Sequence, residues 1–104
     1  MKLIRNFTPM NEAWWLYCIE CKGGGIYVGI TKDVSLRFKQ HKNGRGALYT
    51  KLNPPVSLLC KRAFPSRKEA HQVELKLKKM NRNVKCKFIR QIILEENYSS
   101  DRIS

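Results

Sequence analysis

Two short runs of aromatic and β-branched residues, separated by glycines, most constrain how this chain can fold. The run over 14–19 has the composition of a β-strand, and the run over 26–30 repeats it. Three consecutive glycines at 23–25 suit a tight turn with positive φ. The pattern predicts a β-hairpin with Tyr17 and Tyr27 on neighbouring strands. Whether both tyrosines face the same side depends on the strand register, which the sequence leaves open.

The segment after the hairpin predicts a helix followed by a basic loop. Asp33 can cap a helix that begins at the next residue, since its carboxylate can accept from the exposed amides of the first turn. Arg37 and His41 are four residues apart, so they share one face of that helix, next to the face turned to the core. We expect the stretch 47–55 to form a loop.

A third strand and two further helices complete the expected fold. The apolar run 56–64 is typical of a strand. Ser66 and Glu69 form a capping box at the start of a helix, and Glu74 lies on the shoulder of its buried stripe. That stripe is Ala70, Val73, Leu77 and Met80, and the last helix has core positions at Val84, Phe88, Ile89, Ile92 and Ile93. The sequence predicts an α+β fold: a small three-stranded, mostly antiparallel sheet flanked by helices, in the order β-β-α-β-α-α.

A chain of 104 residues predicts one compact domain. We expect the domain to span 13–96, with an N-terminal extension over 1–12 and a polar tail over 97–104. No apolar run approaches the roughly 20 residues that cross a bilayer, and the beginning of the chain lacks the apolar stretch of a secretory signal. We therefore expect a cytoplasmic protein. The sequence does not indicate its oligomeric state.

The basic charge of this chain is concentrated in its central and C-terminal parts. The formal net charge is +13, and residues 34–94 contain sixteen Lys and Arg but only two acids, Glu69 and Glu74. Such a field attracts a polyanion, and neutralising several phosphates makes binding strongly salt-dependent. We expect a nucleic-acid partner. A membrane surface is the weaker alternative, because no helix combines a broad apolar face with a Lys-rich one.

Two of the four cysteines, Cys18 and Cys21, have the spacing of a pair of metal ligands. No second pair at zinc-like spacing completes four ligands. On a strand, residues three positions apart point to opposite faces, which argues against a shared metal. We expect reduced thiols; a zinc-dependent RNA binder built on this pair stays open as an alternative.

Five residues in order resemble the signature of the GIY-YIG nucleases. Tyr17 fills the tyrosine of the first motif, which here lacks its glycine, and the second motif is filled by Tyr27-Val28-Gly29. The literal Gly-Ile-Tyr at 25–27 overlaps the second motif and is not the first. Arg37, His41 and Glu74 follow in the family's order. The segments 14–17, 27–31, 46–50 and 64–70 resemble the short, stand-alone YhbQ-type members, and the likeness covers about residues 14–92.

The resemblance implies a catalytic role for each of the five residues. Glu74 would hold one divalent cation, Mg²⁺ or Mn²⁺, since hard cations prefer oxygen ligands. Arg37 would bind the scissile phosphate with its planar fork. Tyr17 and Tyr27 would orient or deprotonate the attacking water, and His41 is an alternative base. Each residue also has a purely structural explanation. The tyrosines would be core residues, Arg37 one more basic surface residue and His41 a structural histidine near a helix end. Glu74 would form an ion pair with the lysine four positions on.

The resemblance therefore implies a metal-dependent endonuclease that hydrolyses phosphodiesters in DNA, leaving a 5′-phosphate and a 3′-hydroxyl. Repair, recombination and mobile-element contexts all fit. The alternative is a catalytically weak or inactive nucleic-acid-binding module on the same fold, because the first motif lacks its glycine and the chain has no room for a specificity domain. We expect further contacts with nucleic acid from Gly29, Lys39, Arg45, Tyr49, Thr50 and Lys51.

Overall fold

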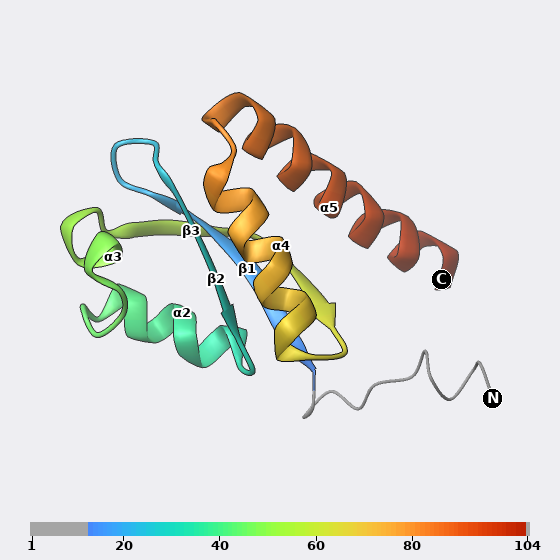
Figure 1. Ribbon diagram of the computed structural model, residues 1–104, viewed down its shortest axis with the longest axis horizontal. Coiled ribbons are helices and arrows are strands. Elements are labelled where there is room, and N and C mark those ends of the chain that lie inside the picture. Colours follow the sequence, from blue (N-terminus) through green and yellow to red (C-terminus); the bar gives the residue numbers. More distant parts are fainter. Residues whose placement is uncertain (1–12, 104) are drawn as a thin grey trace.

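The computed structural model of the protein describes residues 13–103, and the side chains of residues 13–96. The expected extension over 1–12 lies outside the described residues. The hairpin is present: β1 (Trp14–Cys21) and β2 (Ile26–Thr31) pair antiparallel, and β3 (Pro55–Phe64) pairs antiparallel with the other side of β1. The strand order is β2-β1-β3, so β2 is an edge strand. The expected α+β fold with a three-stranded antiparallel sheet is confirmed (Figure 1).

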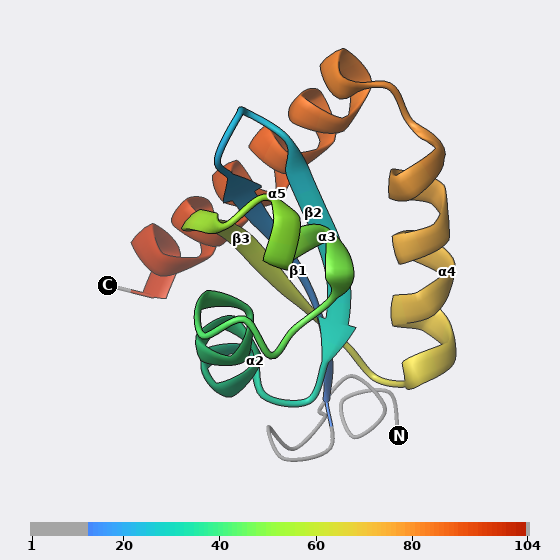
Figure 2. The same cartoon turned by 90° about the vertical axis from the view of Figure 1, so that its left-hand side faces the viewer.

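Helices cover both faces of the sheet. The helix α2 (Val34–Lys42) lies on one side, and α4 (Arg67–Lys79) lies on the opposite side (Figure 2). The long helix α5 (Arg82–Ile103) packs on the same face as α4, where Leu77, Ile89 and Ile92 join the core residues of the sheet. Two apolar clusters result, one on each face of the sheet. No helix in the described part of the chain has both the length and the apolar composition to cross a bilayer.

The predicted N-terminal caps of two helices are confirmed. The Asp33 carboxylate accepts from the Leu36 amide at 3.0 Å and begins α2. The Ser66 hydroxyl accepts from the Glu69 amide at 3.2 Å and begins α4. Each cap satisfies a backbone donor that the first helical turn leaves without a partner, so both helices begin where the sequence places them.

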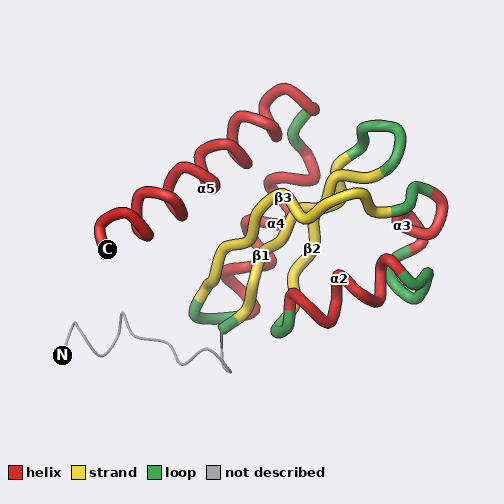
Figure 3. Tube along the Cα trace, turned by 180° about the vertical axis from the view of Figure 1, so that it is seen from behind, coloured by secondary structure: helices red, strands yellow, loops and turns green. Residues whose placement is uncertain are grey.

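Two predicted irregular segments are helical instead. The expected loop over 47–55 contains the short helix α3 (Leu48–Leu52), which leads into β3 (Figure 3). The Ala47 carbonyl accepts from the amides of Thr50 and Lys51 and closes this turn. The polar tail expected from residue 97 is also corrected, because α5 continues to Ile103. No glycine or proline occurs after Pro65 to interrupt helical propagation.

The strand register settles the orientation of the two tyrosines. Tyr17 pairs with Gly29, and Ile19 pairs with Tyr27. Directly paired residues share a face, and so do residues two apart on one strand. Tyr17 and Tyr27 therefore both face α2, together with Ile19 and Cys21. Cys18 lies in the cluster on the opposite face, so Cys18 and Cys21 point apart and are not two ligands of one metal.

Candidate active site

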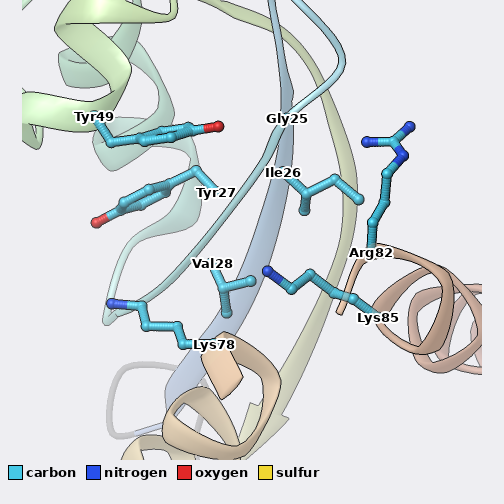
Figure 4. A pocket seen from close by; sticks show the side chains of 8 residues that line it. All are labelled: Gly25, Ile26, Tyr27, Val28, Tyr49, Lys78, Arg82 and Lys85. Carbon is cyan, nitrogen blue, oxygen red and sulfur yellow. The ribbon is translucent and has the colours of Figure 1, made fainter. Parts of the chain in front are cut away.

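An aromatic cluster forms where β1, β2, α2 and α3 meet. The ring centroids of Tyr17 and Tyr27 are 6.3 Å apart, and the His41 ring lies 5.8 Å from Tyr17 and 4.9 Å from Tyr27. The Tyr49 ring stacks on Tyr27 at 6.2 Å with an interplanar angle of 23° (Figure 4). Both predicted tyrosines and the predicted histidine thus occupy one site.

A buried chain of hydrogen bonds fixes the histidine in this cluster. The Tyr17 hydroxyl lies 2.8 Å from His41 Nε2, and His41 Nδ1 lies 2.7 Å from Thr50 Oγ1. The Thr50 hydroxyl donates its one proton to the Ala47 carbonyl at 2.9 Å. It must therefore accept from His41, which carries its proton on Nδ1. His41 Nε2 is then the acceptor, and Tyr17 donates to it.

Two glycines leave room for these side chains. A Cβ atom on Gly29 would lie 2.6 Å from the Tyr17 hydroxyl oxygen and 2.8 Å from Cζ. A Cβ on Gly46 would collide with the His41 ring. The second-motif glycine is therefore explained by the Tyr17 phenol that packs over it, and no strand bulge interrupts the pairing of β1 with β2 at this position.

Burial and neighbouring groups shift the pKa of Tyr17. Burial raises the Tyr17 pKa, and the neighbouring Tyr27 and Glu74 raise it further. Arg37 opposes this rise through a hydrogen bond and through its charge. The pKa of the Tyr17 phenol thus responds to groups from β2, α2 and α4. Arg37 is half-buried, and its guanidinium also donates to the Gln40 amide oxygen at 3.0 Å.

Glu74 is more buried than its predicted place on the helix shoulder, with 8% of its surface exposed. Lys78 Nζ lies 3.2 Å from Glu74 Oε2, and His71 Nδ1 lies 2.9 Å from Oε1. The ion pair that the sequence offered as a structural explanation is therefore present. The side chains of His71 and Lys78 are nearly half exposed, at 45% and 47%, so the solvent reaches both partners of the carboxylate.

The side chains of this site fit a divalent cation only if substrate and water complete its coordination shell. The described residues contain no group of three or more His, Cys, Asp and Glu side chains that could hold a metal ion. Mg²⁺ is usually held by one or two carboxylates, with substrate phosphates and water filling the other positions. Glu74 is a buried carboxylate of this kind among the described side chains, so it is the residue that could hold such a cation.

The residues expected to contact nucleic acid divide into exposed and buried sets. Lys39, Arg45, Tyr49 and Lys51 are exposed and available for contact. Thr50 is only 1% exposed and is fully engaged with His41 and Ala47, so we reassign it from substrate contact to positioning of His41. Gly29 is buried beneath Tyr17, and direct contact with substrate does not fit its place either.

Two residues of the site were not singled out from the sequence, whereas Lys78 was expected as an ion-pair partner of Glu74. His71 lies three residues before Glu74 on α4 and is its helical neighbour on the other side. Gly46 accommodates the His41 ring. The helical spacing was a usable signal for His71, whereas the need for Gly46 becomes visible only once α2 and α3 are in place.

The pKa of His41 predicts how stability depends on pH. Burial, with a further contribution from Arg37, lowers the His41 pKa from 6.5 to about 4. The unfolded chain takes up this proton below pH 6.5, whereas the folded protein resists it until about pH 4. Unfolding is therefore favoured as pH falls through this window. We expect the free energy of unfolding to decrease by about 3 kcal/mol across it, with no such decrease at higher pH. Urea unfolding at several pH values measures the change.

A His41→Gln variant isolates the histidine from other titrating groups. Its unfolding free energy should fall less steeply over the same pH window than that of the wild type. Parallel curves for the two proteins would show that His41 is not held neutral by burial.

Comparison with known proteins identifies the family. The GIY-YIG catalytic domain family matches residues 13–87. A UPF0213 protein of Cupriavidus pinatubonensis is 47% identical over 79 residues, covering 76% of this chain and 88% of the relative. A second, from Cupriavidus necator, is 39% identical over 82 residues, covering 79% of this chain and 89% of the relative. The chain belongs to the GIY-YIG family and, within it, to the short UPF0213 proteins of the YhbQ type.

A solved structure supports the same assignment. The solution structure of a UPF0213 protein from Bacillus halodurans is 38% identical and matches with a TM-score of 0.51. The match covers 76% of this chain and 84% of that one. The GIY-YIG domain implies a nuclease-type activity and association with nucleic acid.

Proposed function

We propose that this protein is an endonuclease that uses Mg²⁺ or Mn²⁺ to hydrolyse phosphodiester bonds in DNA. The observation that carries the proposal is the buried hydrogen bond from Tyr17 to His41 inside the aromatic cluster with Tyr27. There the charges of Arg37 and Glu74 also act on the Tyr17 pKa. These side chains come from β1, β2, α2 and α4. Together they supply a proton acceptor, a phosphate ligand and a metal ligand, which are the groups that phosphodiester hydrolysis needs.

In this proposal Tyr17 and His41 act as one base. A water molecule attacks the phosphorus and the bond from phosphorus to the 3′ oxygen breaks. The proton of the water passes to the Tyr17 oxygen as the Tyr17 proton passes to His41 Nε2, and the departing 3′ oxygen takes a proton from solvent. Burial and, to a smaller extent, the charge of Arg37 lower the His41 pKa in the free protein. An incoming phosphate would offset the part that comes from Arg37 and make His41 a better acceptor. Tyr27, half-buried at the mouth of the cluster, would orient the water.

Two charged groups would act on the phosphate. Arg37 would bind the non-bridging oxygens and stabilise the charge that builds on them as the water attacks. Glu74 would hold the cation, with His71 and Lys78 turning away when it binds. Bound there, the cation supplies Lewis-acid stabilisation of the phosphate and of the departing oxygen.

The proposal is tested by incubating the purified protein with supercoiled plasmid and with branched, nicked and linear DNA. We expect cleavage of at least one substrate with Mg²⁺ or Mn²⁺ and none with a chelator. The same protein should bind DNA with or without the metal, because its basic surface supplies the attraction.

The second candidate function is a nucleic-acid-binding module without catalysis. The engagement of both Glu74 oxygens by His71 and Lys78 is the observation that favours it. This function predicts DNA binding with no cleavage of any substrate under any metal condition. It also predicts that Arg37→Ala leaves DNA affinity unchanged, whereas the nuclease proposal predicts weaker binding.

Thr50 provides a test of the hydrogen-bond chain. Thr50→Val keeps the side-chain volume but removes the hydroxyl that holds the His41 tautomer, and we expect kcat to fall about tenfold, the effect of one lost hydrogen bond. Thr50→Ser keeps the hydroxyl and should retain near wild-type kcat. The dissociation constant for DNA should be unchanged in both variants. Equal kcat for Thr50→Val and wild type would contradict the positioning role.

A further inference from the structure

A groove follows the outer edge of β2 and opens beside the aromatic cluster. Its volume is about 440 Å³, within the range of pockets that hold small organic ligands. Its polar and aromatic lining consists of Tyr27, Tyr49, Lys78, Arg82 and Lys85. We call this feature the β2-edge groove. Because Tyr27 belongs to both, the groove is continuous with the proposed catalytic site.

The lining of the β2-edge groove combines cations with aromatic surface. Three of its side chains are basic and none is acidic. The Tyr27 and Tyr49 rings lie on one side of β2, and Arg82 and Lys85 approach from the other side (Figure 4). Within the described residues no strand pairs with the outer side of β2, so this edge also presents unused backbone groups. Basic side chains next to aromatic rings suit a ligand that has both a negatively charged group and an apolar part.

The groove is built on fixed contacts around the β1–β2 turn. Arg82 donates a hydrogen bond to the Gly24 carbonyl and ties the start of α5 to the turn. Gly25 leaves room for the Tyr49 hydroxyl, since a Cβ at this position would collide with it. Contacts from α3 and α5 thus hold the turn from two directions. This favours binding, because a groove that is already ordered loses little conformational entropy when a ligand binds.

The three basic side chains of the groove differ in the contacts that they already form within the protein. Lys78 pairs with Glu74 at 3.2 Å and lies 5.7 Å from the Tyr27 ring centroid, and Arg82 donates to Gly24. Lys85 forms no salt bridge among the described side chains. It points from α5 toward β2 and is therefore the cation most available to a ligand.

We propose that the β2-edge groove binds the DNA phosphate next to the scissile one, with Lys85 as its main ligand and Arg82 beside it. The sugar lies against the Tyr49 ring. This inference rests on the proposed function, since it names a substrate contact beside the same site. It assigns α5, which the catalytic cluster does not use, to holding the DNA backbone in register with Tyr17 and Arg37.

A matched pair of lysines on α5 tests the proposal. Lys85→Gln removes the groove cation, whereas Lys87→Gln removes an exposed cation that does not line the groove. The two residues are about 200° apart around the helix. The probe is a short fluorescent DNA with a duplex portion and an unpaired end, titrated at several salt concentrations without divalent cations so that it stays intact.

For Lys85→Gln we expect affinity to fall about tenfold at low salt. The slope of log affinity against log salt should decrease by about 1, the signature of one lost phosphate contact. Lys87→Gln should change affinity much less and leave the slope near that of the wild type. Equal effects of the two substitutions, or no effect of either, would overturn the proposal and leave only a diffuse basic field.

The outcome separates this inference from the proposed function. If the wild-type protein binds and cleaves DNA, and Lys85→Gln binds DNA as Lys87→Gln does, only the groove assignment is overturned. A wild-type protein that shows the Lys85-specific slope change but cleaves nothing would support the groove and contradict the nuclease.

Discussion

Substituting glutamine for Glu74 is expected to lower the rate of DNA cleavage by about 10³-fold while leaving DNA binding intact. The change keeps the size of the side chain but removes the charge that holds the cation, and a metal ion contributes several kcal/mol to stabilising a transferring phosphoryl group. Binding should be equal or slightly tighter, because a negative charge leaves a strongly basic surface. Cleavage rates and DNA dissociation constants are measured on the same preparations.

Glu95→Gln is the matched control for this substitution. Glu95 pairs with Arg62 at 3.4 Å on the surface, and about half of each side chain is exposed. Its loss should cost little, as exposed ion pairs contribute about 0–1 kcal/mol, and cleavage should match the wild type. If Glu74→Gln cleaved as fast as Glu95→Gln, the carboxylate would have no catalytic role and its ion pair with Lys78 would explain it fully.

Tyr17→Phe is expected to lower kcat by about 10²–10⁴-fold, the usual contribution of a positioned acid or base. The ring and its packing remain, but the proton path from water to His41 Nε2 is broken. The substrate affinity should change little, because Tyr17 is buried and does not form the groove. Single-turnover cleavage at saturating protein measures the chemical step.

Tyr49→Phe removes the same atom from a ring that stacks on Tyr27 but is not bonded to His41. It should retain kcat within a few-fold of wild type, so the comparison separates the Tyr17 hydroxyl from a general aromatic contribution. A Tyr17→Phe variant that cleaved at the rate of Tyr49→Phe would exclude Tyr17 as part of the base and direct attention to Tyr27.

The parts of the fold that local chemistry determines were predictable from the sequence. The glycines at 23–25 indicate the hairpin, and Asp33 and Ser66 mark the first residues of α2 and α4 because their side chains cap exposed amides. The short helix α3 was not predicted, since it depends on the Ala47 carbonyl and is only five residues long. The continuation of α5 past residue 96 was missed because polar composition does not by itself end a helix.

The candidate site was predictable as a set of residues but not as a geometry. The register that brings Tyr17 and Tyr27 to one face depends on pairing along the whole hairpin. The role of Thr50 was misassigned because a threonine in a basic segment resembles a substrate contact. Only the packing of α3 against α2 buries it beside His41. The ion pair of Glu74 with Lys78, in contrast, follows directly from helical spacing.

In the proposed mechanism, water activated at the Tyr17–His41 pair attacks a DNA phosphate. The most direct measurement is cleavage in water enriched in a heavy oxygen isotope, followed by mass analysis of the new DNA ends. We expect the label in a 5′-phosphate opposite an unlabelled 3′-hydroxyl, in the presence of Mg²⁺ or Mn²⁺ only. A 3′-phosphate product, an unlabelled 5′-phosphate, or no cleavage at all would contradict it.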